Sequence, residues 1–297
     1  MADLSWRDRF KQARRAARYW LVLSLVRLIE NGPASRLPKL RRLLLKIMPL
    51  VFARELQRAR ELLPAEFAAQ TDAILEGMTF NQVTSILEVF LYEKLLAADA
   101  QFITVEGREH LDAARQAGRG IIILSGHYGS WELVAYTLIK LGYELHAIVR
   151  PQALNAMTEL INGFRERRGV KVLMDNNLPS ALKRLKKGGV VGIVSDLNAR
   201  ERGYRVSFFG REASFYHTPI ILAERTGAGL FPVSIERQTG GRHVIRIDPA
   251  LSWDNSLPMP AKVQVYVNAF ERIIRRRPDH WVWFHERYRH AELGRTE

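Results

Sequence analysis

The stretch of sequence that decides the fold is Gly120-Ile121-Ile122-Ile123-Leu124-Ser125-Gly126-His127-Tyr128-Gly129-Ser130-Trp131-Glu132-Leu133-Val134. Its first part, residues 121–124, is an unbroken aliphatic run, which is typical of a strand buried on both faces. A turn with two glycines follows. A helix is expected after the turn, with Ser130 as its N-cap and Glu132 in its first turn. A strand, a glycine turn and a helix in this order predict one unit of an α/β layer.

The same alternation continues through the second part of the chain. Short β-branched runs predict strands at residues 121–124, 145–149, 170–173, 190–194, 230–235 and 244–247. Helical stretches lie between most of them, at residues 131–141, 178–187 and 219–226, and a last helix is expected at 260–276. The pattern therefore predicts an α/β fold with a largely parallel central sheet flanked by helices.

The first part of the chain indicates helices only. Apolar residues recur there at three- and four-residue spacing, as in Leu40, Leu43, Leu44 and Ile47, and prolines divide the helices into pieces. We expect residues 1–100 to form an all-helical N-terminal region and residues 101–297 to form the α/β domain. No flexible linker separates the two, so they are expected to pack as one unit.

Composition and charge limit the possible functions. The chain has no cysteine, which excludes disulfides, thiolate metal sites and a catalytic thiol. Its net charge of +14 calls for a polyanionic partner such as an anionic lipid surface, an acidic carrier protein or a nucleic acid. No helix-turn-helix, zinc or RNA-binding signature accompanies the dispersed basic clusters, so a nucleic-acid partner is disfavoured.

One apolar segment near the start suits a membrane surface. The run from Tyr19 to Val26 ends at Arg27 and is too short to cross a bilayer, which takes roughly 20 apolar residues. Flanking arginines favour a helix that lies in the lipid headgroup layer. A helix packed into the core explains the same pattern equally well.

The turn after the first strand places a histidine where ligands bind in open α/β sheets, at the carboxyl end of a strand. The turn can fold the His127 imidazole back, so that one ring nitrogen donates to Glu132 and the other faces a cleft. A carboxylate behind a histidine fixes its tautomer and stabilises the imidazolium. His127 would then act as a general base toward a hydroxyl. Gly126 and Gly129 would let the backbone approach a ligand closely. Such a His–Glu spacing also occurs by chance, but this placement favours catalysis.

The segment from His127 to Glu132 resembles the H-x4-D/E motif of glycerolipid acyltransferases. It is most similar to the H-x-G-x-W-E form of the late acyltransferases of bacterial lipid A biosynthesis, within the lysophospholipid acyltransferase-like superfamily. The resemblance covers roughly residues 75–290. Further family-like segments follow in the same order: Arg150 after the second strand, Asn162–Gly169, Ser195-Asp196, Val206–Gly210, Thr226–Ala228 with Pro232, and Trp283–Tyr288.

The resemblance implies an acyltransferase that needs no metal or other cofactor and forms no covalent enzyme intermediate. A fatty acyl chain would move from an acyl carrier protein or coenzyme A thioester to a hydroxyl of a phosphorylated lipid, such as a lipid A precursor. The enzyme would work at the cytoplasmic face of the bacterial inner membrane, with His127 and Glu132 as its catalytic residues. Arg150 would hold a phosphate of the acceptor. The acceptor site would further be lined by Gly129, Ser130, Asp196, Phe209 and Gly210.

Two departures from the family pattern leave the identity of the acceptor lipid undecided. The family usually carries Asp-Gln where this chain has Asp196-Leu197, and a threonine-rich stretch where it has residues 214–218. Another glycolipid, an aminolipid or a lysophospholipid remains an alternative acceptor.

Overall fold

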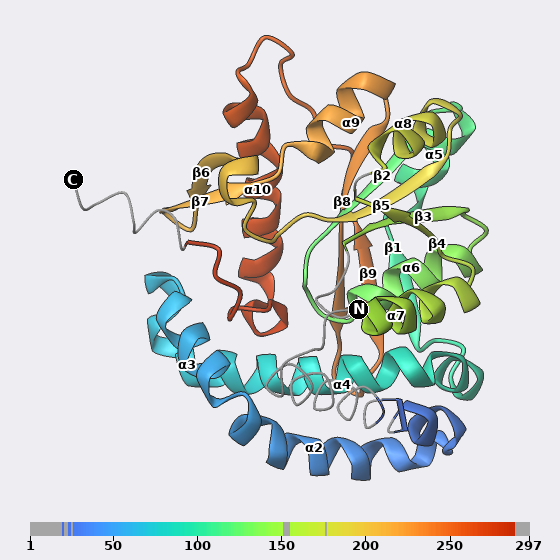
Figure 1. Ribbon diagram of the computed structural model, residues 1–297, viewed down its shortest axis with the longest axis vertical. Helices are drawn as coiled ribbons and strands as arrows, with labels where there is room; N and C mark the ends of the chain where they lie inside the picture. The colour runs from blue at the N-terminus through green and yellow to red at the C-terminus, as the bar shows by residue number, and fades with distance from the viewer. Residues whose placement is uncertain (1–19, 21–22, 25, 151–154, 176, 289–297) are drawn as a thin grey trace, which may run out of the picture.

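The computed structural model describes residues 20, 23–24, 26–150, 155–175 and 177–288 (Figure 1). The first basic cluster, at residues 7–18, and part of the segment predicted to lie on a membrane, including residues 21, 22 and 25, fall outside the described residues. The described residues from 26 to 98 form helices and turns. The elements are η1 (Ala34–Arg36), α2 (Leu37–Val51), α3 (Ala53–Leu62), η2 (Ala65–Gln70) and α4 (Thr71–Ala98).

The central sheet has seven strands in the order β1-β9-β8-β2-β5-β3-β4. Every neighbouring pair is parallel except β8 and β9, which are antiparallel. The strands are β1 (Ile103–Glu106), β2 (Ile121–Ser125), β3 (Leu145–Val149), β4 (Lys171–Met174), β5 (Val190–Val194), β8 (Gly229–Arg237) and β9 (His243–Ile247). The predicted α/β fold with a largely parallel sheet is therefore confirmed.

Helices cover both faces of this sheet because the side chains of a strand alternate between its faces. Ile122 and Leu124 of β2 pack with α8, α9 and α10, whereas Ile121 and Ile123 pack with α5 and α6. The helices are α5 (Arg108–Gln116), α6 (Trp131–Lys140), α7 (Asn155–Arg167), α8 (Leu178–Lys186), α9 (Thr218–Thr226) and α10 (Met259–Arg276), with short 3-10 turns η3 (Arg200–Arg202) and η4 (Pro278–His280).

Parallel pairing places the ends of β2, β3 and β5 at one edge of the sheet. The residues that follow these strands, at 126–130, 150 and 195–196, therefore gather there. A closing segment, residues 280–288, crosses the same edge, and Trp281 forms an antiparallel bridge with Tyr128. Both residues are buried. The fold thus brings three loops and the closing segment together around the His127 turn.

The helical region lies along one end of the molecule, where α2 runs beside α4 (Figure 1). Helix α2 has no buried residue, although Leu40 and Leu44 pack against a small apolar cluster on α4. Three further apolar side chains of α2 face outward: Leu43 is 54% exposed, Val51 64% and Leu50 80%. Within the described part of the chain, no helix combines the length and apolar character that a bilayer crossing requires.

Candidate active site

The His127 turn is held at both ends by hydrogen bonds. The His127 backbone N–H donates to Asp196 Oδ2 at 3.1 Å, and its carbonyl accepts from the Val282 N–H at 3.1 Å. In the side chain, Nδ1 lies 2.6 Å from Asp196 Oδ1. Because an ionised carboxylate can only accept, Nδ1 carries the proton when the imidazole is neutral, and Nε2 then keeps its lone pair. His127 is therefore arranged to take a proton through Nε2.

Asp196 is fully buried behind the imidazole, and Arg287 binds it from the other side. Arg287 donates from one terminal nitrogen to Asp196 Oδ2 at 2.6 Å and from Nε to the Asp196 carbonyl at 2.7 Å. Burial alone would raise the pKa of Asp196, but the His127 and Arg287 charges outweigh it and hold that pKa well below its usual range. The carboxylate therefore stays ionised beside His127.

The predicted pairing of His127 with Glu132 is wrong in this structure, because Asp196 occupies that position. Asp196 follows β5, which lies next to β2 in the sheet. Glu132 instead forms a bidentate ion pair with Arg165 of α7, at 3.1 and 2.5 Å. The Asp196 carboxylate is buried and hydrogen-bonded to His127 and Arg287, and its place in the acceptor wall stays a prediction. A catalytic role for Glu132 stays a prediction.

Gly129 and Ser130 have packing roles where the sequence predicted contact with a ligand. Gly129 has φ +56°, and a Cβ there would lie 2.2 Å from the Ile235 carbonyl oxygen, so only glycine fits. Its N–H donates to the His280 carbonyl at 2.8 Å. The Ser130 side chain is buried, makes no capping hydrogen bond, and lies 3.0 Å from Glu88 Oε2. Both residues hold the His127 turn in place through buried contacts.

A buried ion pair supports this turn from α4. Glu88 of α4 accepts two hydrogen bonds from Arg237 at the end of β8, one of them at 2.7 Å. Arg237 also approaches Ser130 Oγ, at 3.4 Å. Burial raises the pKa of Glu88, but hydrogen bonds from His243 and Arg237 and their charges outweigh this effect and bring the pKa down to about 2. The helical region and the catalytic turn thus share one charged cluster.

Phe209 and Gly210 form the turn of a hairpin, β6 (Tyr204–Phe208) and β7 (Arg211–Phe215). Both have positive φ, at +50° and +73°, which suits a two-residue hairpin turn. The Phe209 ring packs on Phe67 and Trp283. Neither Phe209 nor Gly210 lines the apolar cavity next to Trp131 or the arginine-lined cavity next to His285. Their geometry therefore gives no support to the predicted contact with the acceptor.

An apolar cavity of about 360 Å³ lies on one side of His127. Trp131 lines it, and the centroid of the Trp131 ring is 5.0 Å from that of His127. Glu132 contributes a carboxylate to a wall that is otherwise mostly aliphatic and aromatic, from α4, α6 and α7. The wall includes Ile86, Val89, Phe90, Tyr136, Leu160, Ile161 and Phe164. The cavity can accept a hydrocarbon chain.

A second cavity, of about 590 Å³, lies on the other side and is lined by arginine. His285 forms part of its wall, and the His285 ring centroid is 5.0 Å from that of His127. Burial, together with the charges of Arg287 and His127, lowers the pKa of His285 to about 3, so this imidazole is neutral. Arg150 lines the same cavity, where the sequence predicted a phosphate contact. His127 lines neither cavity, but its ring contacts one wall residue of each, Trp131 of the apolar cavity and His285 of the arginine-lined cavity.

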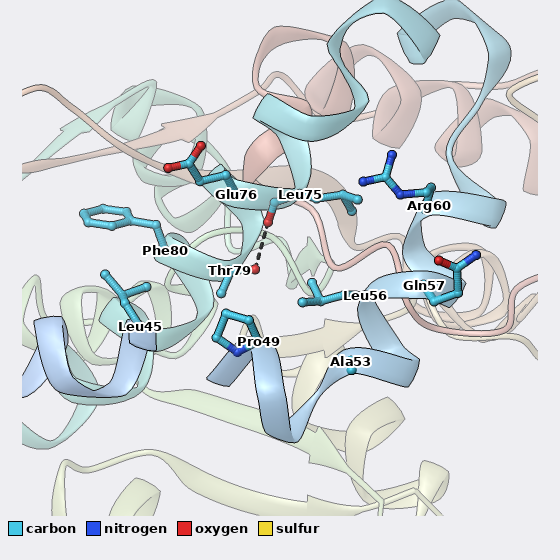
Figure 2. Close-up of a pocket in the computed structure, with 10 residues that line it drawn as sticks. All are labelled: Leu45, Pro49, Ala53, Leu56, Gln57, Arg60, Leu75, Glu76, Thr79 and Phe80. Carbon is cyan, nitrogen blue, oxygen red and sulfur yellow. Dashed lines mark hydrogen bonds between the residues drawn. The ribbon is translucent and has the colours of Figure 1, made fainter. Parts of the chain in front are cut away.

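A third cavity, of about 610 Å³, lies between α2, α3 and α4 (Figure 2). Leu45, Leu56, Leu75 and Phe80 line it, with Arg60 and Glu76 among the few charged side chains. None of the predicted site residues belongs to its wall. Its size alone therefore does not make it the site of the chemistry.

Sequence reasoning assigned no role to Arg165, His285 and Arg287. The signal was present, because these residues lie in two of the segments that resemble the family, Asn162–Gly169 and Trp283–Tyr288. Their roles depend on which side chains they meet in space: Arg165 meets Glu132, and Arg287 meets Asp196.

Comparison with known proteins finds similarity to acyltransferases. The chain is similar to the phosphatidylinositol mannoside acyltransferase of Mycobacterium tuberculosis, with 25% identity over 182 residues, 60% of this chain and 57% of that protein. It is also 24% identical over 201 residues to the lipid A biosynthesis palmitoleoyltransferase of Escherichia coli, covering 66% of this chain and 64% of that protein. Both alignments span less than two thirds of the relative's length.

A solved structure, that of the 1-acyl-sn-glycerophosphate acyltransferase of Thermotoga maritima, matches with 14% identity and a TM-score of 0.36, covering 81% of this chain and 95% of that chain. A family model described as bacterial lipid A biosynthesis acyltransferase matches residues 7–290. Since that match spans nearly the whole chain, the protein belongs to the bacterial lipid A biosynthesis acyltransferase family.

Proposed function

We propose that this chain is an O-acyltransferase that moves a fatty acyl group from an acyl thioester to a hydroxyl of a phosphorylated lipid. One observation carries the proposal: the imidazole of the His127–Asp196 pair contacts a wall residue of an apolar cavity, Trp131, and a wall residue of an arginine-lined cavity, His285. An acyl chain and a charged head group need these two environments. Membership of the family supports the same class of reaction.

In the proposed reaction the acceptor hydroxyl oxygen attacks the carbonyl carbon of the thioester. Nε2 of His127 takes the hydroxyl proton, and the imidazolium is stabilised by Asp196. The tetrahedral intermediate collapses, the C–S bond breaks, and the leaving thiolate receives the proton from His127. An ester and a free thiol result, with no covalent enzyme intermediate and no cofactor.

The apolar cavity beside Trp131 is proposed to hold the acyl chain during this step. Its aromatic wall, with Phe90 and Phe164 in edge-to-face contact at 4.9 Å, would close around a hydrocarbon. Burying the chain there also supplies binding energy remote from the reacting carbonyl, which can be used to orient it.

The acceptor is proposed to be a phosphorylated glycolipid such as a lipid A precursor. Arg150 in the basic cavity supports a phosphate on the acceptor, and the Escherichia coli relative is named for lipid A biosynthesis. An inositol-containing glycolipid is the second candidate, because the mycobacterial relative is named for phosphatidylinositol mannoside. The thioester donor would be acyl carrier protein or coenzyme A, and a basic surface favours an acidic carrier protein.

The proposed working place is the cytoplasmic face of the bacterial inner membrane. Helix α2 supports a lipid surface as partner, because outward-facing Leu43, Leu50 and Val51 alternate along it with Lys39, Arg42 and Lys46. No acidic residue occurs between Glu30 and Glu55. Apolar side chains next to cations are the combination that an anionic headgroup layer attracts.

The decisive experiment is transfer in vitro by the purified chain. Acyl carrier protein and coenzyme A thioesters would be offered against a panel of phosphorylated and neutral lipids, with products identified by mass spectrometry. We expect transfer to a phosphorylated lipid. His127→Ala should lower kcat about 10²- to 10⁴-fold. His110→Ala, a histidine on α5 outside the site, serves as the matched control. No transfer to any acceptor, or a normal rate in His127→Ala, would refute the proposal.

A further inference from the structure

The arginine-lined cavity contains cations without partners of their own. Arg150, Arg200 and Arg202 contribute to its wall. Within the described part of the chain, the side chains of Arg200 and Arg202 form no ion pair. Arg150 is held in place, with Nε 3.2 Å from Asp175 Oδ2 and its guanidinium 4.2 Å above the Tyr216 ring. Two unpaired guanidinium groups and one fixed group therefore share a cavity beside the catalytic histidine.

Acidic residues in the same wall do not neutralise this group. Glu286 lies in the wall, but its carboxylate is 3.4 Å from Arg58, outside the cavity. Glu201 sits between the two free arginines. His285, the wall residue nearest His127, is neutral. The cavity therefore keeps an excess of positive charge.

The backbone that carries these arginines is fixed and strained. Arg200 has φ +52°, a left-handed conformation that is unfavourable for a non-glycine residue. Its N–H donates to Asn198 Oδ1 at 2.8 Å, and its carbonyl accepts from Ser214 Oγ at 2.6 Å. The Asn198 amide donates in turn to the Glu286 carbonyl at 2.9 Å. Strain maintained by surrounding hydrogen bonds is characteristic of ligand-binding loops.

We propose that Arg200 and Arg202, together with Arg150, bind a phosphate ester of one of the two substrates. Guanidinium groups are weakly hydrated, and their planar donors match phosphate oxygens. The ester is either the head-group phosphate of the acceptor or the phosphopantetheine phosphate of the thioester donor. The ring contact between His285 and His127 places the cavity next to the reacting group. This inference rests on the proposed function and extends it to two residues of η3.

The test uses binding, so that it can be read without turnover. Calorimetry on the full chain would compare 4′-phosphopantetheine with pantetheine, and glucosamine 1-phosphate with glucosamine. The Arg200→Gln/Arg202→Gln double variant removes both free cations. Arg205→Gln is the matched control, because it removes one arginine from the same part of the chain. Arg205 does not line the cavity and pairs with Glu212 at 3.1 Å.

We expect wild type to prefer the phosphorylated member of one pair. The double variant should weaken that binding about ten- to hundredfold, and the Arg205→Gln control should leave it unchanged. Loss for phosphopantetheine assigns the phosphate to the donor, and loss for the sugar phosphate assigns it to the acceptor. Equal binding of phosphorylated and unphosphorylated ligands, or equal affinity in the double variant and wild type, would overturn the inference. Absence of transfer in the assay described above would refute the function while leaving this binding result readable.

Discussion

The imidazole of His127 donates its hydrogen bond to a carboxylate that is 69 residues further along the chain. Asp196 in turn is neutralised by Arg287, so three residues from three loops form one charged unit. Arg287 donates a hydrogen bond to Asp196, and Asp196 accepts one from His127. These bonds fix the orientation of the His127 ring. A histidine in this setting differs from a free one mainly in which nitrogen is left as the base.

Replacing Asp196 by asparagine should abolish most activity. The amide cannot stabilise an imidazolium and can hold the ring in the wrong tautomer, so we expect kcat to fall about 10²- to 10⁴-fold. Activity would be measured per folded molecule, with circular dichroism as the check, because Arg287 loses its buried partner as well. Asp112→Asn, on α5 outside the site, is the control, because Asp112 pairs with Arg108 at 3.0 Å and does not contact His127. Near-normal kcat in Asp196→Asn, with a large loss in Glu132→Gln, would restore the pairing expected from the sequence.

His285 should make the fold sensitive to acid. Its folded pKa of about 3 lies below the value of about 6.5 for an unfolded histidine. Between these values the unfolded chain binds a proton that the folded chain does not, so stability falls as the pH falls. Asp196 acts in the same direction only below about pH 4, where unfolded aspartate becomes protonated.

Urea denaturation at pH 5 and pH 7 would measure this effect. His285→Gln should reduce the pH dependence of the unfolding free energy, which a single proton sets at up to about 1.4 kcal/mol per pH unit. His110→Gln should leave the dependence as in wild type. If both variants keep the wild-type slope, His285 is not the residue responsible.

For single residues, the sequence was a better guide to which side chains gather at the His127 turn than to how those side chains pair. His127 and Asp196 were both named as site residues, yet the expected partner of His127 was Glu132. The spacing of His127 and Glu132 is visible in one segment, whereas the adjacency of β2 and β5 is a property of the sheet. A second reason is that Arg165 of α7 binds the Glu132 carboxylate, which therefore pairs with Arg165 and not with His127. Local spacing could not reveal either fact.

A buried ion pair joins helix α4 to strand β8 next to the His127 turn. Glu88 and Arg237 lie away from solvent, with Ser130 and His243 as further partners. The pair is well satisfied, but removing either ion would leave the other buried without its counter-charge. Its contribution is therefore best tested by removing one ion and then both.

Glu88→Ala should destabilise the fold by about 3–5 kcal/mol, because Arg237 would be left buried without its counter-charge. The double variant Glu88→Leu/Arg237→Met should recover much of the loss, since an apolar pair needs no counter-charge. Glu66→Gln, at an exposed pair with Arg275, should cost less than about 1 kcal/mol. Urea denaturation of the four proteins gives the comparison. A double variant less stable than Glu88→Ala would contradict this account.

Most strands and helices of the α/β part could be predicted because their apolar runs are long and uninterrupted. Strand β2 was recognisable from four aliphatic residues, all of them buried. Strand β1 and the hairpin β6–β7 were not predicted. β1 has only four residues of alternating exposure at the edge of the sheet, and β6 carries exposed polar residues along much of its length. Short, half-exposed strands resemble loops until their partners are known.

The molecule as a whole combines a net charge of +14 with one helix that lays apolar side chains on its surface. The division into residues 1–100 and 101–297 remains a prediction, although α4 ends at Ala98 and β1 begins at Ile103. The proposal of a lipid layer as the large anionic partner rests on this charge and on the exposed face of α2.

Vesicle co-sedimentation tests this partner. Leu50→Glu/Val51→Glu should reduce binding to phosphatidylglycerol vesicles at least about tenfold, because two apolar side chains lose their burial and two negative charges face the lipid. Leu257→Glu, at an exposed leucine far from α2 in the sequence, should have little effect. Equal binding of both variants would remove α2 from the interface. Tight binding to generic duplex DNA without vesicle binding would favour a nucleic-acid partner instead.

The closing segment also sets when the His127 site can form during synthesis of the chain. Val282 and His280 hold the backbone of the His127 turn, and Arg287 holds Asp196 in its ionised form. A nascent chain that has emerged from the ribosome only as far as α10 already contains His127 and Asp196, yet lacks the residues that lock them together. The hydrogen bonds that fix His127 and Asp196 can therefore form only after residue 287 has been added to the chain.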